Sequence, residues 1–312
     1  MYSLSVVIPT FNRGNVLLDT IGYLLDQDDC ADEIIVVDQT QYDDDSDLKK
    51  SLIGLEQKKV IRWVQREEPS IPKAMNHGLL LASSDYVLFL DDDVLFSNDF
   101  IHQHRQALIK HKSIGHVGQI VQPWQEPIDL KNYNPGKGLN RDLSFPFHCK
   151  QSHQVNNCMA GNLCVKRDVA IAAGGFDQRF NQTAYRFESE FSKRMCRHTR
   201  KLLSFEPQAT LNHLHVNSGG TRSHGDFFTS ITPIHSACNY YFALQEGSFT
   251  EAFEYILRRF IKSIADKFYL RKPWWIPVRI IAEVRGFFWA MSMYRKGPIY
   301  IDSESLDSGS VK

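Results

Sequence analysis

The chain has 312 residues, of which 43% are apolar and 23% are charged, as in ordinary soluble globular proteins. Its 36 Lys and Arg balance its 36 Asp and Glu, so the overall charge gives no reason to expect a nucleic-acid partner. The six cysteines form no CxxC pair and no zinc-ligand spacing, and we expect reduced thiols in a reducing compartment.

The N-terminus begins directly with a strand-like stretch, YSLSVVIPTFNR. It has neither the basic region nor the apolar region of a signal peptide. No uncharged apolar run along the chain approaches the ~20 residues that a membrane span requires. We therefore expect a cytoplasmic protein.

Apolar runs alternate with helical patterns through the first third of the chain. Continuous apolar strands separated by helices predict βαβ units and a parallel sheet that is covered on both faces. The expected strands are Leu4–Pro9, Glu33–Asp38, Val60–Gln65 and Tyr86–Leu90, and the expected helices are Asn15–Asp26, Ser46–Gln57 and Pro72–Ala82.

Acidic residues follow two of these strands, with Asp38 at the end of one and Asp91, Asp92 and Asp93 directly after another. In an open α/β sheet, ligands bind beyond the carboxyl ends of the strands. Three adjacent carboxylates repel one another unless a cation neutralises them, and Mg²⁺ or Mn²⁺ binds carboxylates together with substrate phosphates. The run predicts a divalent-cation site. The alternative is a turn of solvated acids that caps the next helix.

The middle of the chain is less regular. A helix is expected after Ser97 or Asn98, with Phe100, Ile101, His104 and Leu108 on one apolar stripe. Residues 122–157, rich in Pro, Gly, Asn and aromatics, are predicted to form a long irregular insertion.

A βα unit is expected in AGNLCVKRDVAIAAGGFD and a helix in RFESEFSKRMCRH. One or two strands are expected in KLLSFEPQATLNHLHV, where His213 and His215 would face the same side of a strand.

Two nucleotide-binding fingerprints are absent from the sequence. IPTFNRG stands after the first strand in place of G-x-G-x-x-G, and G-x-x-x-x-G-K-[ST] does not occur. Dinucleotide oxidoreductases and P-loop ATPases are therefore disfavoured.

Six segments, in chain order, together resemble the family 2 glycosyltransferases. They are SVVIPTFNR, IIVVDQT, PKAMNHGL, DYVLFLDDD, AGNLCVKRDVAIAAGGFDQRF and ESEFSKR. The resemblance runs in order over about Ser3 to Gly220, roughly two-thirds of the chain. The resemblance implies a GT-A fold, which is an α/β Rossmann-type mixed sheet flanked by helices. It also implies an inverting transfer of a sugar from a nucleotide-diphosphate-sugar to a hydroxyl acceptor. The acceptor would be a glycan or a lipid-linked glycan in polysaccharide, lipopolysaccharide or glycoconjugate synthesis.

The resemblance also implies roles for individual residues. Asp93 would bind the metal, Mn²⁺ or Mg²⁺, together with His213, or with His215 as the alternate. Glu188 would be the catalytic base, at a position where the family usually has Asp, and Glu190 is its competitor. The residues implied to bind the donor are Pro9, Thr10, Asn12, Arg13, Asp38, Asn76, Asp91 and Asp92. Met75, where the family commonly has Arg, and Gln39 depart from the family pattern.

The C-terminal region has a different composition. From Arg258 to Lys296 there are ten Lys and Arg but only two acids, interleaved with aromatic residues such as Trp274 and Phe288. This pattern predicts either an interfacial contact with the inner face of a membrane or packing of the aromatics against the catalytic domain.

We expect a nucleotide-sugar-binding half at residues 1–110 and an acceptor-binding, catalytic half at 111–231. A helical C-terminal extension would follow at 232–301, and a disordered tail at 302–312. Two other functions remain open. A nucleotidyltransferase that makes a nucleotide-sugar should carry a glycine-rich, basic loop near the first strand. A catalytically degenerate scaffold is supported only by the altered motif around Glu188.

Overall fold

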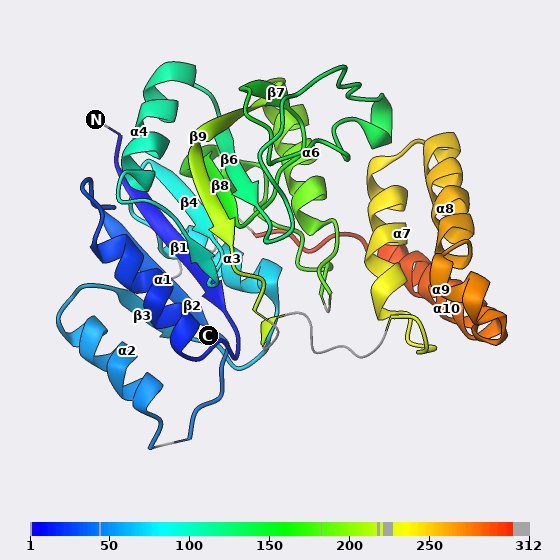
Figure 1. Ribbon diagram of the computed structural model, residues 1–312, viewed down its shortest axis with the longest axis horizontal. Coiled ribbons are helices and arrows are strands. Elements are labelled where there is room, and N and C mark those ends of the chain that lie inside the picture. The colour runs from blue at the N-terminus through cyan, green and yellow to red at the C-terminus, as the bar shows by residue number, and fades with distance from the viewer. Residues whose placement is uncertain (1, 44, 182, 217–218, 221–226, 302–312) are drawn as a thin grey trace.

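One mixed β-sheet forms the centre of the molecule. The computed structural model describes residues 2–43, 45–181, 183–216, 219–220 and 227–301 (Figure 1). In the sheet the strands lie in the order β3-β2-β1-β4-β8-β6-β9-β5, and β7 pairs with β9. The strands are β1 (Leu4–Thr10), β2 (Glu33–Asp38), β3 (Arg62–Gln65), β4 (Tyr86–Leu90), β5 (Val94–Leu95), β6 (Gly115–Val121), β7 (His153–Val155), β8 (Asn162–Lys166) and β9 (Leu203–His213).

The first four long strands are parallel, as the sequence predicts. β1 lies between β2 and β4, and β2 pairs with β3. The sheet becomes mixed at β8, which runs antiparallel between β4 and β6. The stretch expected to hold one or two strands forms the single strand β9. A register shift occurs where β9 passes Gly118 and Gln119 of β6.

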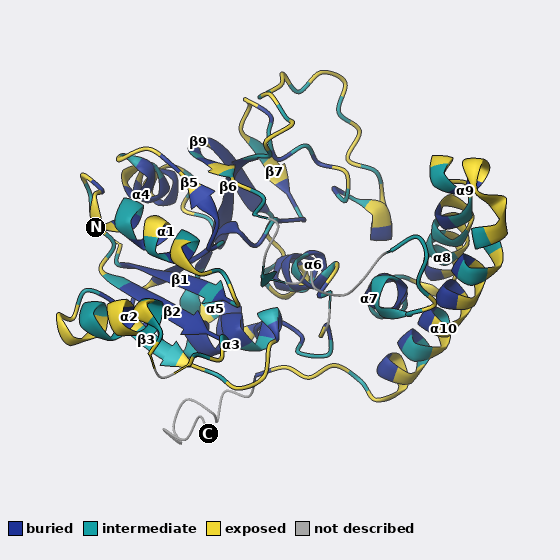
Figure 2. Ribbon diagram, turned by 60° about the horizontal axis from the view of Figure 1, so that its bottom comes forward, coloured by how far each residue is buried: buried dark blue, intermediate teal, exposed yellow. Residues whose placement is uncertain are grey.

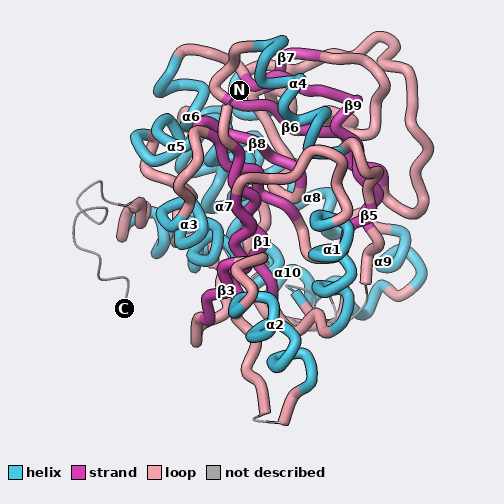
Figure 3. The backbone as a smooth tube through the Cα atoms, turned by 90° about the vertical axis from the view of Figure 1, so that its left-hand side faces the viewer, coloured by secondary structure: helices cyan, strands magenta, loops and turns pink. Residues whose placement is uncertain are grey.

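Helices cover both faces of the sheet (Figure 3). Successive side chains of a strand point to opposite faces, so Val7 packs in one core with Ala74, and Val6 packs in the other with Leu17. Each such buried side chain stabilises the fold by about 1.5–3 kcal/mol. The helices are α1 (Asn15–Leu25), α2 (Asp47–Gln57), α3 (Ile71–Leu81), α4 (Phe100–His111), α5 (Arg167–Ala172) and α6 (Phe187–Thr199). The expected α/β architecture is confirmed.

The predicted insertion at residues 122–157 is mostly irregular, with a short 3₁₀ helix η1 (Gly138–Asn140) and the strand β7. Buried Asp142 organises it by accepting hydrogen bonds from the hydroxyl of Tyr133 and the backbone N–H of Asn156, both at 2.9 Å.

The C-terminal residues form a helical extension at one end of the molecule, beyond α6 (Figure 1). Its helix α7 is anchored by the hydroxyl of Tyr241, which donates to Asp177 Oδ2 at 2.7 Å. After the last helix the chain returns to the part of the molecule that holds the sheet, where Ile301 N donates to the carbonyl of Gly174 at 3.0 Å. The elements are α7 (Ile234–Glu246), α8 (Phe249–Ile264), α9 (Lys267–Arg271), the 3₁₀ helix η3 (Pro273–Trp275) and α10 (Ile276–Arg295).

The sequence left open whether the aromatics of this extension pack against the protein or face a membrane, and the structure contains both packed and exposed aromatics. Phe287 and Trp289 pack against the core, whereas Trp274 and Phe288 are exposed. No helix in the described ranges is long and apolar enough to cross a membrane. All six cysteines are free thiols. The predicted disordered tail, residues 302–312, lies outside the described residues.

Candidate functional site

A cavity of about 580 Å³ opens at the carboxyl ends of β1 and β4. Ligands of open α/β sheets bind at this edge, because the loops that follow the parallel strands converge there. Its walls come from the ends of β1, β4 and β9, from the start of α3, and from residues 159–161, 181 and 183–188. The predicted site residues that line it are Pro9, Thr10, Arg13, Asp91, Asp92, Asp93, Glu188 and His213.

Two carboxylates and one imidazole converge on one side of this cavity. His213 Nε2 lies 3.1 Å from Asp93 Oδ1 and 3.6 Å from Asp91 Oδ2. One ligand atom from each of the three residues lies within 4.8 Å of the others. Carboxylate oxygens and an imidazole nitrogen suit Mn²⁺ or a similar divalent cation. The donor set therefore fits a metal ion.

The middle aspartate is paired with Arg13. Arg13 Nε lies 2.9 Å from Asp92 Oδ1, and its Nη2 lies 3.3 Å from Asp93 Oδ2. The third guanidinium nitrogen donates to the carbonyl of Val216 at 3.1 Å. One arginine thus partly neutralises two of the three carboxylates, while Asp91 is the half-buried carboxylate of the run.

Burial and charge act on these aspartates in opposite directions. Burial raises the pKa of Asp92 to about 7, although the positive charge of Arg13 acts to lower it. Burial would also raise the pKa of Asp93, but hydrogen bonding to His213 and the charges of His213 and Arg13 together lower it. Asp93 is therefore an ionised carboxylate within the donor set.

Glu188 lies in the first turn of α6 and lines the same cavity. The backbone N–H of Ala160 donates to its Oε2 at 3.0 Å and fixes the carboxylate. Burial raises the pKa of Glu188 to about 7, and the nearby charge of Asp91 acts in the same direction. A carboxylate with a pKa near neutrality can accept a proton from a hydroxyl group.

Glu190, the competing base, has a structural role. It is buried, and its two carboxylate oxygens bind Arg194 at 2.6 and 2.9 Å. Arg194 also donates to the carbonyl of Gly175 at 2.6 Å, and the ring of Tyr300 lies 4.1 Å from its guanidinium carbon. Glu190 is not among the residues that line the cavity.

Three residues expected to bind the donor, Asn12, Asp38 and Asn76, do not line the cavity. Asp38 accepts hydrogen bonds from Thr40 N (2.9 Å), Tyr42 Oη (2.6 Å) and Trp63 Nε1 (3.1 Å). Asn76 exchanges two hydrogen bonds of 2.7 Å with the backbone of Phe176. Asn12 is exposed beside the cavity wall.

The expectation that His213 and His215 share one face of a strand is wrong. β9 ends at His213, and His215 follows in a left-handed conformation with φ of 56°. The imidazole of His215 packs edge-on against Trp124, with ring centroids 4.9 Å apart. His213 is the histidine that belongs to the donor set.

Sequence reasoning missed several residues of the cavity. Gly161 lies so close to Asp91 that a Cβ there would be 2.0 Å from Asp91 Oδ2. Tyr185 and Arg186 line the wall next to Glu188, and Gln39 lines it between Thr10 and Ser70. The departure of Gln39 from the family pattern was visible in the sequence, but the loop at 181–187 has no pattern that indicates its position.

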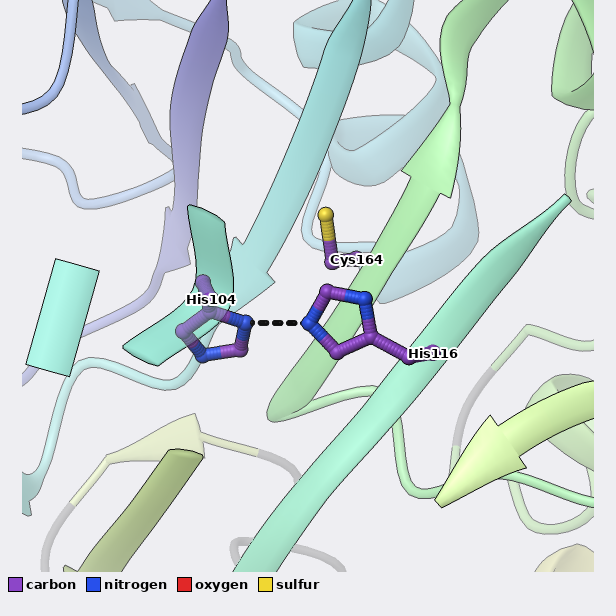
Figure 4. A group of neighbouring side chains, drawn as sticks. All are labelled: His104, His116 and Cys164. Carbon is purple, nitrogen blue, oxygen red and sulfur yellow. Dashed lines mark hydrogen bonds between the residues drawn. The ribbon is translucent and has the colours of Figure 1, made fainter. Parts of the chain in front are cut away.

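A second group of possible metal ligands lies in the core (Figure 4). His104 of α4 and His116 of β6 point toward each other, and Nδ1 of one lies 2.7 Å from Nε2 of the other. Cys164 of β8 is the third member, and all three residues are buried. Burial lowers the pKa of His104 to about 3, it also lowers the pKa of His116 well below the ordinary histidine range, and it raises the pKa of the Cys164 thiol. The pair is a neutral hydrogen bond that joins α4 to the sheet.

Relatives known from their sequences are glycosyltransferases. The chain is 35% identical over 146 residues to the GalNAc(5)-diNAcBac-PP-undecaprenol beta-1,3-glucosyltransferase of Campylobacter jejuni, covering 46% of this chain and 45% of that protein. It is 24% identical over 212 residues to a chondroitin synthase of Pasteurella multocida, covering 57% and 21%. The chain thus spans about a fifth of the length of the chondroitin synthase.

Solved structures share the fold. Residues 1–349 of S. aureus TarS, in complex with UDP-GlcNAc, match 95% of this chain and 92% of that chain, with a TM-score of 0.59 and 15% identity. GalNAc-T7 with UDP, GalNAc and Mn²⁺ matches 69% and 44%, with a TM-score of 0.53 and 13% identity. The expected GT-A fold is confirmed. Residues 5–172 match the family described as Glycosyl transferase family 2, and the chain belongs to that family.

Proposed function

We propose that this glycosyltransferase moves a sugar from a nucleotide-diphosphate-sugar to a hydroxyl acceptor by metal-assisted direct displacement, with inversion at the anomeric carbon. The observation that carries the proposal is that one cavity contains both the Asp91, Asp93 and His213 donor set and the carboxylate of Glu188. The fold shared with TarS bound to UDP-GlcNAc, and with GalNAc-T7 bound to UDP and Mn²⁺, supports it.

Asp91, Asp93 and His213 would hold the cation, Mn²⁺ or Mg²⁺. When bound, a divalent cation neutralises the charge that develops on the departing nucleoside diphosphate. His213 would bind through Nε2 without its proton, and Asp93 would bind as the ionised carboxylate. Asp92 would stay paired with Arg13, which lies 2.9 Å from it and also contacts Asp93 at 3.3 Å.

Glu188 would act as the general base. It takes the proton from the acceptor hydroxyl as the oxygen attacks the anomeric carbon, while the bond from that carbon to the diphosphate breaks. The N–H of Ala160, 3.0 Å from Oε2, holds the carboxylate in one orientation during this transfer. Because a single displacement occurs, the configuration of the sugar inverts.

The donor would lie along Pro9, Thr10 and Arg13, which line the cavity on the β1 side. Asp38 would act on this wall indirectly, because it accepts a hydrogen bond from the N–H of Thr40, whose hydroxyl accepts one from the N–H of Asn12 at 2.9 Å. Asn12 lies between Phe11 and Arg13, which line the cavity. Asn76 would act on the wall near Glu188, because it holds the backbone of Phe176, whose ring packs against Phe187 of the cavity wall with centroids 5.5 Å apart.

We also propose a role in the synthesis of cell-surface polysaccharide or glycoconjugates, in the cytoplasm, with a glycan or a lipid-linked glycan as the acceptor. The activities of two relatives support this proposal. One is a glucosyltransferase that acts on an undecaprenol-linked glycan, and the other is a chondroitin synthase.

The test compares the turnover number of Glu188→Gln with that of the unmodified chain, using a nucleotide-sugar that the protein binds. The amide cannot accept the proton, so we expect turnover to fall by about 10²-fold or more while the affinity for the donor stays unchanged. Glu188→Asp should retain partial activity, and Glu68→Gln, an exposed carboxylate at the same cavity, should behave as the unmodified chain. Full turnover in Glu188→Gln would remove Glu188 from the mechanism. No turnover in the unmodified chain, despite donor binding, would favour the degenerate scaffold.

A further inference from the structure

Helix α8 carries an apolar stripe that the fold leaves uncovered. Phe249, Phe253, Leu257 and Ile261 are spaced by four residues, so they follow one side of the helix. Their exposed fractions are 87%, 62%, 47% and 55%. The buried residues of α8, Ala252 and Ser263, lie on a different side of the helix, which packs on the rest of the extension. We call the four residues the α8 stripe.

More large apolar side chains are exposed on the elements that follow α8 in the chain. Leu270 on α9 is 76% exposed, and Trp274 in η3 is 66% exposed. On α10, Ile281, Val284 and Phe288 are also exposed, at spacings of three and four. Figure 2 shows exposed residues along α8, α9 and α10 at the end of the molecule remote from the first strands of the sheet. Large apolar side chains gathered in this way indicate an interaction surface.

The same elements are strongly basic on their surface. Between residues 249 and 296, eight Lys and Arg are exposed but only two acids, Glu254 and Asp266. Arg258 and Lys262 each follow a stripe residue in the sequence, and Lys267, Arg271 and Lys272 surround Leu270 and Trp274 in the sequence. The partner that complements this surface is therefore both apolar and anionic.

A bilayer that contains anionic lipid has this combination of properties. Amphipathic helices with basic flanks lie in the headgroup region with their apolar side chains at the acyl boundary. A second copy of the chain would fit poorly, because a symmetric contact through this surface would bring its excess of positive charges together. None of the described helices can span the bilayer, so the contact would be interfacial.

We propose that α8, α9 and η3 dock the enzyme on an anionic membrane surface, with the α8 stripe and Trp274 entering the interface. This inference rests on the lipid-linked acceptor of the proposed function and adds the docking surface and the lipid class. Docking itself does not require catalysis. The extension is fixed to the catalytic part by Tyr241 and Asp177, and Thr183 of the cavity wall donates to the carbonyl of Ile234 at 3.2 Å. A docked extension therefore holds the cavity at a constant place relative to the lipid, where a lipid-linked acceptor would reach it.

The experiment is co-sedimentation of the full chain with vesicles of phosphatidylcholine alone or with added phosphatidylglycerol, at low and high salt. We expect binding to the anionic vesicles only, weakened by salt. The double variant Phe253→Glu, Leu257→Glu should bind at least about tenfold more weakly, because both stripe residues would carry a charge into the interface. The matched control is Ile109→Glu on α4, which is also 47% exposed but lies outside the extension, and it should bind like the unmodified chain.

Melting temperatures verify that the variants are folded, and Lys262→Glu with Arg271→Glu tests the charge independently of the stripe. The proposal is overturned if the unmodified chain fails to bind anionic vesicles, or if the stripe variant binds as well as Ile109→Glu. It is also overturned if sedimentation velocity without lipid shows a dimer that the stripe variant dissociates, since a second copy would then cover the stripe. Asp93→Ala should lose transfer but keep vesicle binding, which separates failure of this inference from failure of the catalytic proposal.

Discussion

The three consecutive aspartates have three different surroundings. Asp91 is half-buried and faces the cavity, Asp92 is paired with Arg13, and Asp93 lies against His213. A helix cap would require one carboxylate, and the helix that follows begins only at Phe100. The run therefore serves the cavity and not the helix. The position of this run after β4 could be predicted from the sequence. Which aspartate contacts Arg13 and which contacts His213 could not be predicted, because these two residues are far away in the chain.

Gly161 controls the position of Asp91. A Cβ at this residue would lie 2.0 Å from Asp91 Oδ2, so Gly161→Ala should push the carboxylate out of the donor set. Because the displaced atom is the end of a side chain, the melting temperature should change little. We expect the affinity for Mn²⁺ to fall by about ten- to hundredfold, measured by calorimetric titration. Gly54→Ala, where a Cβ would meet nothing within 4 Å, is the control. Unchanged Mn²⁺ affinity in Gly161→Ala would exclude Asp91 as a ligand.

The protonation state of Glu188 should limit activity on the acid side of neutrality. The pKa of this carboxyl is raised to about 7 by burial and by the charge of Asp91, and only the ionised form can accept a proton. We expect kcat/KM to rise with pH up to a midpoint at or somewhat below 7, because a cation bound beside Asp91 would lower the pKa. Glu188→Asp should shift this midpoint, whereas Glu68→Gln should not. About two pH units around the pKa suffice to see the transition. If kcat/KM stayed constant from about pH 5 to 8, or fell as the pH rose over this range, Glu188 would not be the base.

Among the helices, α4 illustrates which features could be predicted from the sequence and which could not. The apolar stripe of Phe100, Ile101, His104 and Leu108 was predicted from its spacing, and all four side chains are buried. The partner of His104 was not predicted, because His116 lies on β6 and a neutral pair of histidines leaves no periodic signal. The same holds for the α6 motif, where spacing alone could not separate Glu188 in the cavity from Glu190 at Arg194.

The buried pair should make the protein sensitive to acid. Burial lowers the pKa of His104 to about 3 and also lowers the pKa of His116 well below the ordinary histidine value of ~6.5. Below pH ~6.5 these histidines therefore bind protons in the unfolded chain but not in the folded chain. Stability is therefore lost as the pH falls below about 6.5, by up to about 1.4 kcal/mol per pH unit for each histidine. We would measure the free energy of unfolding in urea at several pH values between 6.5 and 4.5, a range of about two units over which the difference is measurable. This free energy should fall less steeply with falling pH in His104→Leu than in the exposed control His102→Gln. If both variants lost stability equally steeply with falling pH, the two histidines would not be a neutral pair in the folded protein.

At the scale of the whole molecule, one sheet runs through both proposed halves of the catalytic part. β8 from the second half lies between β4 and β6, so residues 1–110 cannot complete the sheet without the strands that follow. The sequence predicted this α/β architecture well because parallel buried strands have a strong local signal. It predicted the helical extension from composition, but not how Tyr241, Asp177 and the returning chain at Ile301 attach it. Those contacts are long-range and involve residue types that occur everywhere in the sequence.

The central claim is that the cavity binds a nucleotide-sugar together with a divalent cation. The most direct measurement is a thermal-shift screen with UDP-, GDP-, dTDP- and CMP-sugars, each with and without Mn²⁺. A ligand that binds only the folded state stabilises it by about 2.7 kcal/mol at a hundredfold excess over Kd. We predict a shift for one nucleotide class that requires Mn²⁺, disappears in Asp93→Ala and persists in Asp19→Ala, an exposed aspartate of α1. A shift that is equally large without Mn²⁺ and in Asp93→Ala would contradict the metal site, and no shift with any donor would contradict the claim as a whole.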